Sequence, residues 1–586
     1  MLRRLFFLCV TLLTFFKILA GGEPNDKIDT SLINRFLVRS ANEYIILLKE
    51  RTVFSHQLPL NSKVKKAEFV YNSLLKKAEN TQKNLIDFLN NSKIPYQSFV
   101  IINAIKVTTD FQLMMSIAKR DDVGQIIDNG PIKMLDYLID EDQTSQRSIK
   151  AEWGLRMIKA DSVWLMGFRG NGVIVGGQDT GYDWDVKPLI KKYKGYKDSS
   201  TVNHNFNWHD AVHKNSPQFP DSLKNPCGYD LKEPCDDNNH GTHTMGTMVG
   251  DDENNKIGVA PDAKWIACRN MDRGWGQPST YLECFEWFLA PTDLDGKNAN
   301  PGKAPHVINN SWYCSSDEGC NASNFKIMEE AVKNLKASGV VVVVSAGNSG
   351  PGCGTVNGPP AFFEQSFSVG ATDINDLIAG FSSRGPVVID SSMRLKPNVS
   401  APGAGVRSVI GNGSYVSFSG TSMAGPHVAG VVALMISANP ALAGKVDLIE
   451  NIIESSAVAK ISDQVCAGIQ SNKIPNAVYG YGRVDALAAV KKAQMLVSGT
   501  TDNIDQSILN VMPNPSSEYI NISLGSDLSG IQEINIFDAT GKKIMQYKYE
   551  TLIYQVELQI SEWKPGIYFC HARSGMINYS AKFIKF

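Results

Sequence analysis

The sequence lacks an excess of charge of either sign, because its 586 residues include 58 Lys and Arg against 59 Asp and Glu. A net charge of −1 supplies no extended basic surface for a polyanion, so nucleic acid is not an expected partner. The 48 glycines and 26 prolines follow no collagen-like or linker-like period, and no repeat of solenoid length is present. The composition is that of a globular chain, long enough for roughly three to four domains.

Long apolar runs are also scarce, and the one at the N-terminus is short. Arg3 and Arg4 precede an apolar run over 5–16, which is the layout of a cleaved secretory signal. The run falls short of the roughly 20 apolar residues that a spanning helix needs, which disfavours the alternative of an N-terminal membrane anchor. No later stretch reaches that length. We therefore expect residues 1–20 to be a signal peptide and the exported protein to be soluble.

Cysteine is infrequent, with 10 residues in the chain. Export permits disulfides, and two pairs lie close in sequence, namely Cys227 with Cys235 and Cys314 with Cys320. Buried free thiols are the alternative, since removal of the signal peptide leaves an odd number of cysteines and at least one unpaired. The spacing does not determine the connectivity.

Residues 42–130 have the pattern of a small α+β domain. Strand-like and helix-like runs alternate in it, over 43–48, 65–89, 99–108, 111–118 and 123–127. This order fits a split βαβ, ferredoxin-like arrangement. The polar stretch 140–147 that follows has no periodicity, so we expect an exposed linker or a cleavage site there.

The pattern changes to α/β over residues 150–496. Short apolar runs typical of buried parallel strands recur, at 173–175, 265–267, 306–308 and 340–344. Helix-period segments such as 324–338 and 427–438 lie between or after them. The alternation predicts a doubly wound, mostly parallel sheet with helices on both faces. In such folds, ligands bind beyond the carboxyl ends of the strands.

The tail over residues 505–586 differs again, because its strand-like segments alternate apolar and polar residues. Such segments occur at 519–523, 534–537, 553–558 and 566–569, with turn residues between them. This pattern predicts a small antiparallel β-sandwich, and we expect no independent chemistry in it.

A carboxylate follows the first buried strand of the α/β region, in the motif Asp179-Thr180-Gly181. Asp-Thr-Gly is also the signature of aspartic peptidases, whose chemistry needs two carboxylates that share a proton. A second such motif is absent from the sequence. Without other motifs, Asp179 would be interpreted as a turn or helix-capping residue.

Two histidines three positions apart, His240 and His243, lie in a segment of small residues over 239–247. With Cys227 and Cys235 upstream they suggest a zinc site. That interpretation is the weaker one, because the cysteines lack the usual spacing and no His-Glu-x-x-His motif is present. The alternative is an imidazole general base, with His240 at the amino end of a helix.

A serine precedes the most apolar helix-like segment, in Gly420-Thr421-Ser422-Met423-Ala424. Ala424 stands where the Gly-x-Ser-x-Gly elbow of α/β-hydrolases has its last glycine, so that turn is not supported. A serine at a helix amino terminus gains from the positive end of the helix dipole, which favours negative charge developing nearby. Alone, Ser422 would be an ordinary capping residue.

The three motifs occur in the chain order Asp179, His240, Ser422, which is the order of the subtilisin triad. With Asp-Thr-Gly, His-Gly-Thr-His and Gly-Thr-Ser-Met-Ala in register, the sequence resembles the subtilisin-like serine peptidases over about residues 150–495. Shorter motifs are similar to the bacillopeptidase F branch of this family, at 153–155, 235–240, 289–293 and 307–312.

This resemblance implies a role for each matching residue. Ser422 would be the nucleophile, His240 the base that takes its proton, and Asp179 the carboxylate that orients the imidazole. Asn348 matches the oxyanion-hole asparagine. The substrate-binding positions implied are Ser311, Trp312, Tyr313 and Gly347. Many relatives have glycine where Tyr313 stands, so side-chain specificity does not transfer.

No cofactor is implied for the chemistry itself. The segment 254–259 is similar to a calcium loop of the family, yet it continues directly into Ala260 and Pro261 without the extra turn of some relatives. Structural calcium is therefore compatible with the resemblance, but the sequence does not place it.

The resemblance extends to both flanking regions. Residues 42–130 are similar to the inhibitory propeptide of the family, which would assist folding, cover the cleft and be removed near 140–152. The tail is similar to the type IX secretion sorting domain of Bacteroidetes proteins, through the motifs at 512–515, 534–542 and 564–569. The secretion machinery is then a partner, with export across a bacterial outer membrane to the surface or medium. A generic domain that binds substrate or a surface is the alternative.

The sequence thus predicts a secreted serine endopeptidase that cleaves polypeptides through an acyl-enzyme at Ser422. It would be made as a zymogen, with its own propeptide as inhibitor. A catalytically silent secreted binding scaffold and a zinc hydrolase are the two rival functions.

Overall fold

The computed structural model describes most of the chain, and the described residues are 24–54, 60, 62–134, 137–140, 151–220, 222–313, 322–470, 472–498, 509–524, 531–553, 555–574 and 577–586. The expected signal peptide, most of the expected linker and the pair Cys314 and Cys320 lie outside them. The chain divides into two compact units, Met1–Leu496 and Val497–Phe586.

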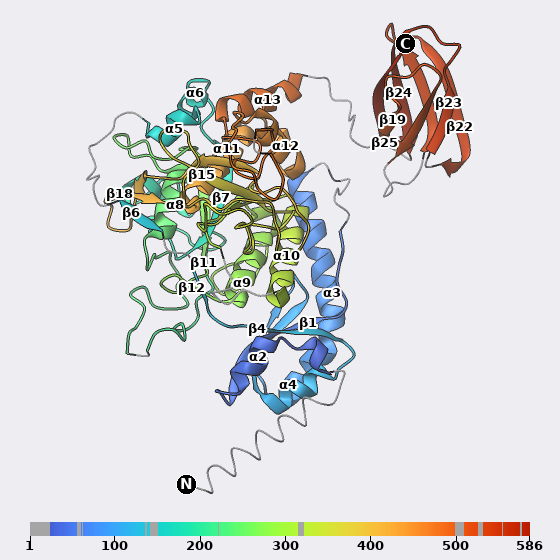
Figure 1. The fold of residues 1–586 in the computed structure, drawn as a ribbon. Coiled ribbons are helices and arrows are strands. Elements are labelled where there is room, and N and C mark those ends of the chain that lie inside the picture. Colours follow the sequence, from blue (N-terminus) through green and yellow to red (C-terminus); the bar gives the residue numbers. More distant parts are fainter. Residues whose placement is uncertain are drawn as a thin grey trace. The chain divides into compact units, whose positions relative to one another are not determined.

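A seven-stranded sheet forms the centre of the first unit (Figure 1). Its spatial order is β10 (Trp208–Asp210), β11 (Lys264–Arg269), β7 (Ile174–Asp179), β13 (Val307–Asn310), β14 (Val341–Ser345), β15 (Phe367–Thr372) and β16 (Val399–Pro402). Every neighbouring pair is parallel. The predicted parallel α/β sheet is therefore confirmed.

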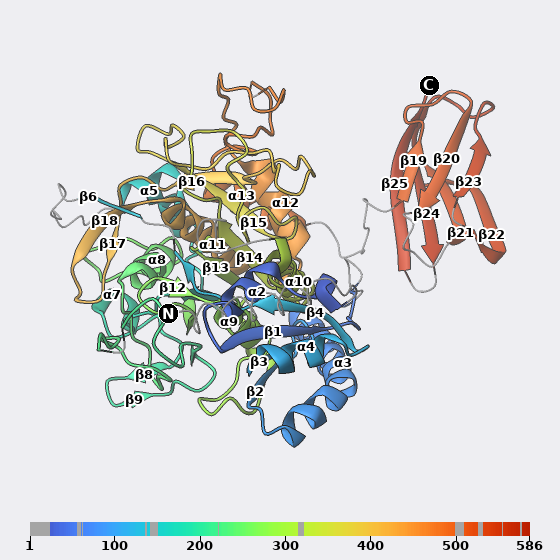
Figure 2. The ribbon, with the colours of Figure 1, turned by 60° about the horizontal axis from the view of Figure 1, so that its bottom comes forward.

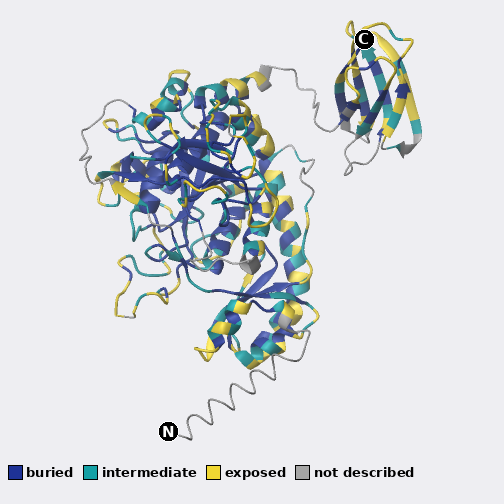
Figure 3. Ribbon diagram, in the orientation of Figure 1, coloured by how far each residue is buried: buried dark blue, intermediate teal, exposed yellow. Residues whose placement is uncertain are grey.

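Helices cover both faces of this sheet, and the residues of β14 show how. Val341 and Val343 belong to the core that contains α8 (His240–Val249) and α11 (Thr421–Ala438). Val342 and Val344 point the other way, into the core that contains α9 (Pro278–Leu289) and α10 (Ala322–Ala337). Apolar residues on both sides of each strand explain the continuous hydrophobic runs in the sequence. Figure 3 shows the sheet as the most deeply buried part of the unit.

Among the described residues, α11 alone has the length and apolar composition to cross a membrane, and 89% of it is buried. That burial is expected of a helix at the centre of a globular core. The remaining elements of the α/β region are α5 (Trp153–Met157), α6 (Ala160–Leu165), α7 (Lys187–Ile190), β8 (Tyr196–Asp198), β9 (Thr201–Val202), β12 (Trp275–Gly276), η2 (Pro301–Lys303), β17 (Val406–Val409), β18 (Tyr415–Ser419), η4 (Pro440–Leu442), α12 (Val446–Ser456) and α13 (Ala486–Ser498).

An N-terminal subdomain precedes this region and forms its own four-stranded antiparallel sheet, in the order β2-β3-β1-β4. Its elements are η1 (Pro24–Lys27), α2 (Thr30–Phe36), β1 (Ala41–Leu48), α3 (Lys63–Asn91), β2 (Tyr96–Phe99), β3 (Ala104–Asp110), α4 (Phe111–Ala118) and β4 (Val123–Asp128). The strand predicted over 99–108 is two strands, because the amides of Val100 and Ile101 leave the ladder and donate to Glu286 of α9.

The subdomain packs against α9 and α10, as Figure 2 shows from below. Ile45, Leu47 and Phe99 of its sheet belong to the same buried cluster as Phe285 of α9 and Ala331 of α10. The subdomain and the α/β region therefore share one of the hydrophobic clusters, which explains why they form a single compact unit.

The second unit contains two antiparallel sheets around a core of its own. One sheet has the order β19 (Leu509–Met512), β20 (Tyr519–Leu524), β23 (Gln555–Gln559). The other has the order β22 (Lys543–Ile553), β21 (Ile531–Asp538), β24 (Gly566–Ser574), β25 (Ile577–Lys585). Ile534 and Ile536 of β21 point into the core while their neighbours are more exposed, as alternation requires.

Three disulfides join described residues. Cys227–Cys235 confirms one predicted pair. Cys268–Cys284 ties β11 to α9, and Cys353–Cys466 joins positions 113 residues apart. Sequence spacing could not indicate these two bonds, because each depends on how distant elements pack. Cys570 is buried and free.

Candidate active site

A hydrogen bond joins Asp179 to His240 at the carboxyl end of the central sheet. Asp179 is the last residue of β7 and His240 is the first residue of α8. His240 Nδ1 lies 2.8 Å from Asp179 Oδ1, and both side chains are buried. A carboxylate accepts only from the protonated nitrogen, so Nδ1 carries hydrogen and Nε2 is left as the basic atom.

The glycine after His240 makes this approach possible. A Cβ added at Gly241 would lie 2.0 Å from the carbonyl oxygen of Gly181, which no structure tolerates. Any other residue would push α8 away from the turn that follows β7. The small residues of the histidine motif therefore set the distance between the carboxylate and the imidazole.

Ser422 is the second residue of α11, and its side chain faces β13. Its Oγ donates to the carbonyl of Ser311 at 3.0 Å, while the Ser311 hydroxyl donates to the carbonyl of Ser422 at 2.7 Å. His240 Nε2 has no hydrogen-bond partner within the described part of the chain. The hydroxyl is thus directed away from the imidazole in this structure.

Asn348 lies just beyond β14 and is oriented by the residue before Ser422. Its Oδ1 accepts from the backbone N–H of Thr421 at 2.9 Å and from the Thr421 hydroxyl at 2.8 Å. These two donors fix the amide so that Nδ2 remains a free donor group. Nδ2 would lie 3.3 Å from a Cβ at Gly420, so glycine there leaves its approach open.

The predicted substrate-binding positions also meet at this edge. Trp312 stacks on Tyr281, with ring centroids 4.1 Å apart. The Tyr313 hydroxyl donates to Asn357, and its ring lies 3.0 Å from where a Cβ of Gly347 would be. The Tyr313 ring therefore fills the space beside Gly347. A glycine at position 313 would leave that space empty.

The histidine and cysteine residues of the zinc interpretation do not form a metal site. Cys227 and Cys235 are joined in a disulfide, so neither is a thiolate ligand. His243 stacks on Phe418 at 4.3 Å and its Nε2 donates to the carbonyl of Val416. Burial lowers the pKa of His243 to about 3, so it remains neutral as a core residue. These residues offer no four-ligand set for zinc.

A segment of the N-terminal subdomain crosses the site. β5 (Ile132–Lys133) pairs antiparallel with β12, and the next amide, that of Met134, donates to the carbonyl of Gly274 at 2.7 Å. β6 (Leu138–Asp140) pairs antiparallel with β18, the strand that leads to Ser422. Backbone pairing with β12 at one end and with β18 at the other thus holds this segment in place.

Between these pairings, Tyr137 covers the imidazole of His240. The two ring centroids are 5.0 Å apart, and the Tyr137 hydroxyl lies 3.1 Å from Asn238 Oδ1. Sequence analysis missed this contact. The one available signal was the short apolar run of Tyr137, Leu138 and Ile139 directly before the polar linker.

The loop expected to resemble a calcium site is occupied by an internal cation. Asn255 Oδ1 accepts from Arg407 Nη2 at 2.9 Å, and its Nδ2 donates to Asp252. Arg407 also pairs with Glu152 at 2.9 Å and lies over the ring of Tyr415. No cluster of three or more His, Cys, Asp or Glu side chains suited to a metal occurs in the described ranges. The residues of this loop do not fit calcium.

Comparison with known proteins identifies the family. The pattern of the subtilase family matches residues 170–482, more than half of the chain. Bacillopeptidase F of Bacillus subtilis is 32% identical in an alignment of 506 residues that covers 79% of this chain and 32% of its own. Subtilisin DY of Bacillus licheniformis is 32% identical over 293 residues, 50% of this chain and 86% of its own. The chain belongs to the subtilase family and is thus classed with the serine-type endopeptidases, whose chemistry needs no cofactor.

Two further matches concern the fold and the tail. The crystal structure of the epidermin leader peptide processing serine protease of Staphylococcus aureus has a TM-score of 0.55 at 16% identity, covering 77% of this chain and 99% of that one. This likeness supports the fold alone. Residues 510–585 match the pattern of a secretion system C-terminal sorting domain. The chain spans about a third of the length of bacillopeptidase F.

Because Arg407 supplies the cation of its loop, we predict that this loop depends on Arg407 and not on calcium. Arg407→Met should lower the midpoint of thermal unfolding, since leaving buried polar partners unpaired costs about 1–3 kcal/mol each. Added calcium should not restore the stability lost in the Arg407→Met variant, and a variant that calcium returns to the midpoint of the unchanged chain would contradict this assignment.

Proposed function

We propose that this chain is a secreted endopeptidase that cleaves polypeptides through an acyl-enzyme at Ser422 and is made as a self-inhibited zymogen. The observation that carries the proposal is the buried Asp179–His240 hydrogen bond, which leaves Nε2 of the imidazole as a base beside the helix that begins at Thr421. A silent binding scaffold would have no use for this arrangement.

The proposal gives each group a role. His240 Nε2 takes the proton of Ser422 Oγ as the oxygen attacks the scissile carbonyl carbon, and Asp179 stabilises the imidazolium that forms. Asn348 Nδ2 and the Ser422 N–H donate to the oxyanion of the tetrahedral intermediate. The imidazolium then protonates the leaving amine, and water releases the acyl group by the same steps. The Ser422 hydroxyl must first turn from the Ser311 carbonyl toward His240.

Replacing the nucleophile is the direct test. Ser422→Ala should abolish hydrolysis of casein and labelling by a fluorophosphonate, while the thermal unfolding midpoint stays near that of the unchanged chain. Ser199→Ala, at an exposed position, serves as the matched control and should retain both activities. Hydrolysis that survives in the Ser422 variant would exclude an acyl-enzyme at this residue.

The crossing segment supports the proposed self-inhibition. Residues on both sides of His240 pair with β12 and β18 as an extended peptide would, and Tyr137 covers the imidazole. In this proposal the N-terminal subdomain is a propeptide with a ferredoxin-like topology, and it presents its own chain to the site as a bound peptide. β4 comes directly before this segment in the chain.

We predict that maturation begins with a cut between Met134 and Tyr137, upstream of the polar linker at 140–152. Pairing with β12 ends at Met134, pairing with β18 begins at Leu138, and the imidazole lies against Tyr137 between them. Mass spectrometry of the released fragment over time, with N-terminal sequencing of the larger product, checks this position. The purified Ser422→Ala precursor should stay intact. If the first products all end within 140–152, the segment does not lie as a substrate.

Polar contacts from α9 hold the propeptide on the catalytic region. Asn129 Oδ1 accepts from the Ser279 N–H at 2.9 Å, at the first turn of α9. Glu286 accepts from the amides of Val100 and Ile101 at 2.6 and 2.9 Å. Burial in this interface raises the pKa of Glu286 to about 7, although the two N–H donors oppose the rise.

The raised pKa of Glu286 predicts that the cleaved propeptide is held less tightly as pH rises. Once the propeptide is released, Glu286 faces water and its pKa returns to about 4.5. Binding of the propeptide therefore takes up a proton when the pH lies between about 4.5 and about 7. The contribution of protonated Glu286 to the binding free energy of the propeptide is fully present below about pH 4.5 and is lost as pH rises through about 7. Size-exclusion chromatography of the cleaved complex between pH 5 and 9 should show retention at the acid end and release above neutrality.

Glu286→Gln keeps an acceptor for both amides without ionising, so it should flatten this pH dependence. Glu364→Gln, at an exposed position, is the control and should behave like the unchanged chain. Equal pH dependence in all three proteins would show that another group governs release.

We also propose export by the type IX route. The match of residues 510–585 to a secretion sorting domain supports a role of the second unit in delivery to the cell surface or medium. The unit contains none of the groups assigned to the chemistry.

A further inference from the structure

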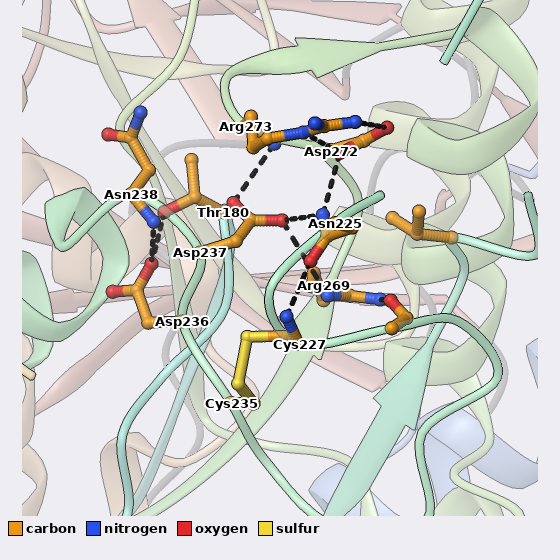
Figure 4. A network of polar contacts seen from close by, with 12 residues as sticks. Thr180, Asn225, Cys227, Cys235, Asp236, Asp237, Asn238, Arg269, Asp272 and Arg273 are labelled. Carbon is orange, nitrogen blue, oxygen red and sulfur yellow. Dashed lines mark hydrogen bonds and ion pairs between the residues drawn. A yellow bond between two sulfur atoms is a disulfide. The ribbon is translucent and has the colours of Figure 1, made fainter. Parts of the chain in front are cut away.

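The loop that leads to the catalytic histidine is held on two opposite sides. It runs from β10 to α8 over residues 211–239, of which all but residue 221 are described, and the Cys227–Cys235 disulfide closes its second half. Asp236 and Asp237, side by side near its end, turn in different directions (Figure 4). We call this segment the histidine loop.

Asp236 binds the elements that carry the acid and base. Its Oδ1 accepts from the Thr180 hydroxyl at 2.8 Å, next to Asp179. Its Oδ2 accepts from the N–H and hydroxyl of Thr242 at 2.8 and 2.6 Å, two residues after His240. This carboxylate therefore fixes the histidine loop to the start of α8 and to the turn after β7.

Asp237 binds the turn that leads into β12. Its Oδ1 accepts from the backbone N–H of Arg273 at 2.9 Å, and its Oδ2 accepts from Asn225 Nδ2 at 2.5 Å. The same Asn225 amide donates to Asp272 at 2.6 Å. Arg273 has φ of 50°, in the left-handed region that only surrounding contacts can hold for such a residue. The turn therefore depends on the histidine loop for its conformation.

A buried cation stabilises this arrangement. Arg269, at the end of β11, is fully buried and binds Asp210 through two hydrogen bonds of 2.9 and 2.8 Å. Its Nη1 lies 3.6 Å from Asp237 Oδ2. The Asp237 side chain is itself fully buried, so this guanidinium is the positive charge that compensates it.

We infer that Asp237 is a positioning residue that holds the substrate-pairing strand β12 in register with the catalytic histidine. β12 and the Gly274 carbonyl are the groups that pair with residues 132–134, whereas the hydrogen bonds of Asp237 go to Asn225 and to the Arg273 N–H. It acts through Arg273. The inference rests on the peptidase activity and on substrates that follow the path of the crossing segment.

The two neighbouring carboxylates make a matched pair for the test. Asp237→Asn places an N–H₂ group opposite one of its two donors, Asn225 Nδ2 or the Arg273 N–H, so one of the two hydrogen bonds through which Asp237 holds the β12 turn, directly or through Asn225 and Asp272, is lost. The matured variant should show KM raised about 10- to 100-fold for a peptide amide that extends four residues before the scissile bond. Its kcat, its hydrolysis of a single-residue ester and its rate of fluorophosphonate labelling should each stay within about threefold.

Asp236→Asn should behave differently, with lower kcat and slower labelling for both substrates, because it loosens the base itself. Asn225→Ala leaves Asp237 one donor and should raise KM for the long peptide in the same selective way, which covers the case that Asp237→Asn fails to fold. Glu233→Gln, an exposed carboxylate of the histidine loop, is the control. Equal losses on the long and short substrates, or no loss on either, would overturn the inference. An unchanged chain that hydrolyses neither substrate would instead refute the proposed peptidase activity.

Discussion

The close approach of the turn after β7 to the first turn of α8 is the constraint on which the site depends. Asp179 and His240 meet at 2.8 Å only because Gly241 has no side chain to separate the two backbones. The bond then determines which imidazole nitrogen is basic. In the proposed chemistry every later step uses that nitrogen, so the absence of a side chain at Gly241 is a condition for it.

The parallel sheet brings the other groups to the same edge. Ser311 follows β13 and Asn348 follows β14, while Ser422 opens α11 above them. The N-terminal subdomain uses two separate surfaces of this scaffold. Its sheet rests on α9 and α10, which cover the face of the central sheet opposite α8 and α11, and its last segment returns over His240. The residues that attach the subdomain are thus different from those that lie over the imidazole.

Much of this could be predicted from the sequence, for physical reasons. Runs such as 340–344 are apolar on every residue because both faces of β14 are buried, and the three motifs identify the family. The break between β2 and β3 could not be foreseen, because Val100 and Ile101 bond to Glu286, far away in the chain. Tyr137 was missed for the same reason, since its role arises only from strand pairing with β18. Local patterns record local structure, and these contacts are not local.

The Cys353–Cys466 disulfide sets an order of events during biogenesis. Cys353 lies four residues before Asn357, the partner of Tyr313, while Cys466 lies near the end of the catalytic region. In a chain that leaves the cytoplasm amino end first, this bond cannot form until almost the whole catalytic region has crossed. Among the three disulfides of the described residues, this one is consequently the last that can form, and a precursor halted midway through translocation would lack the covalent link near Asn357 and Tyr313.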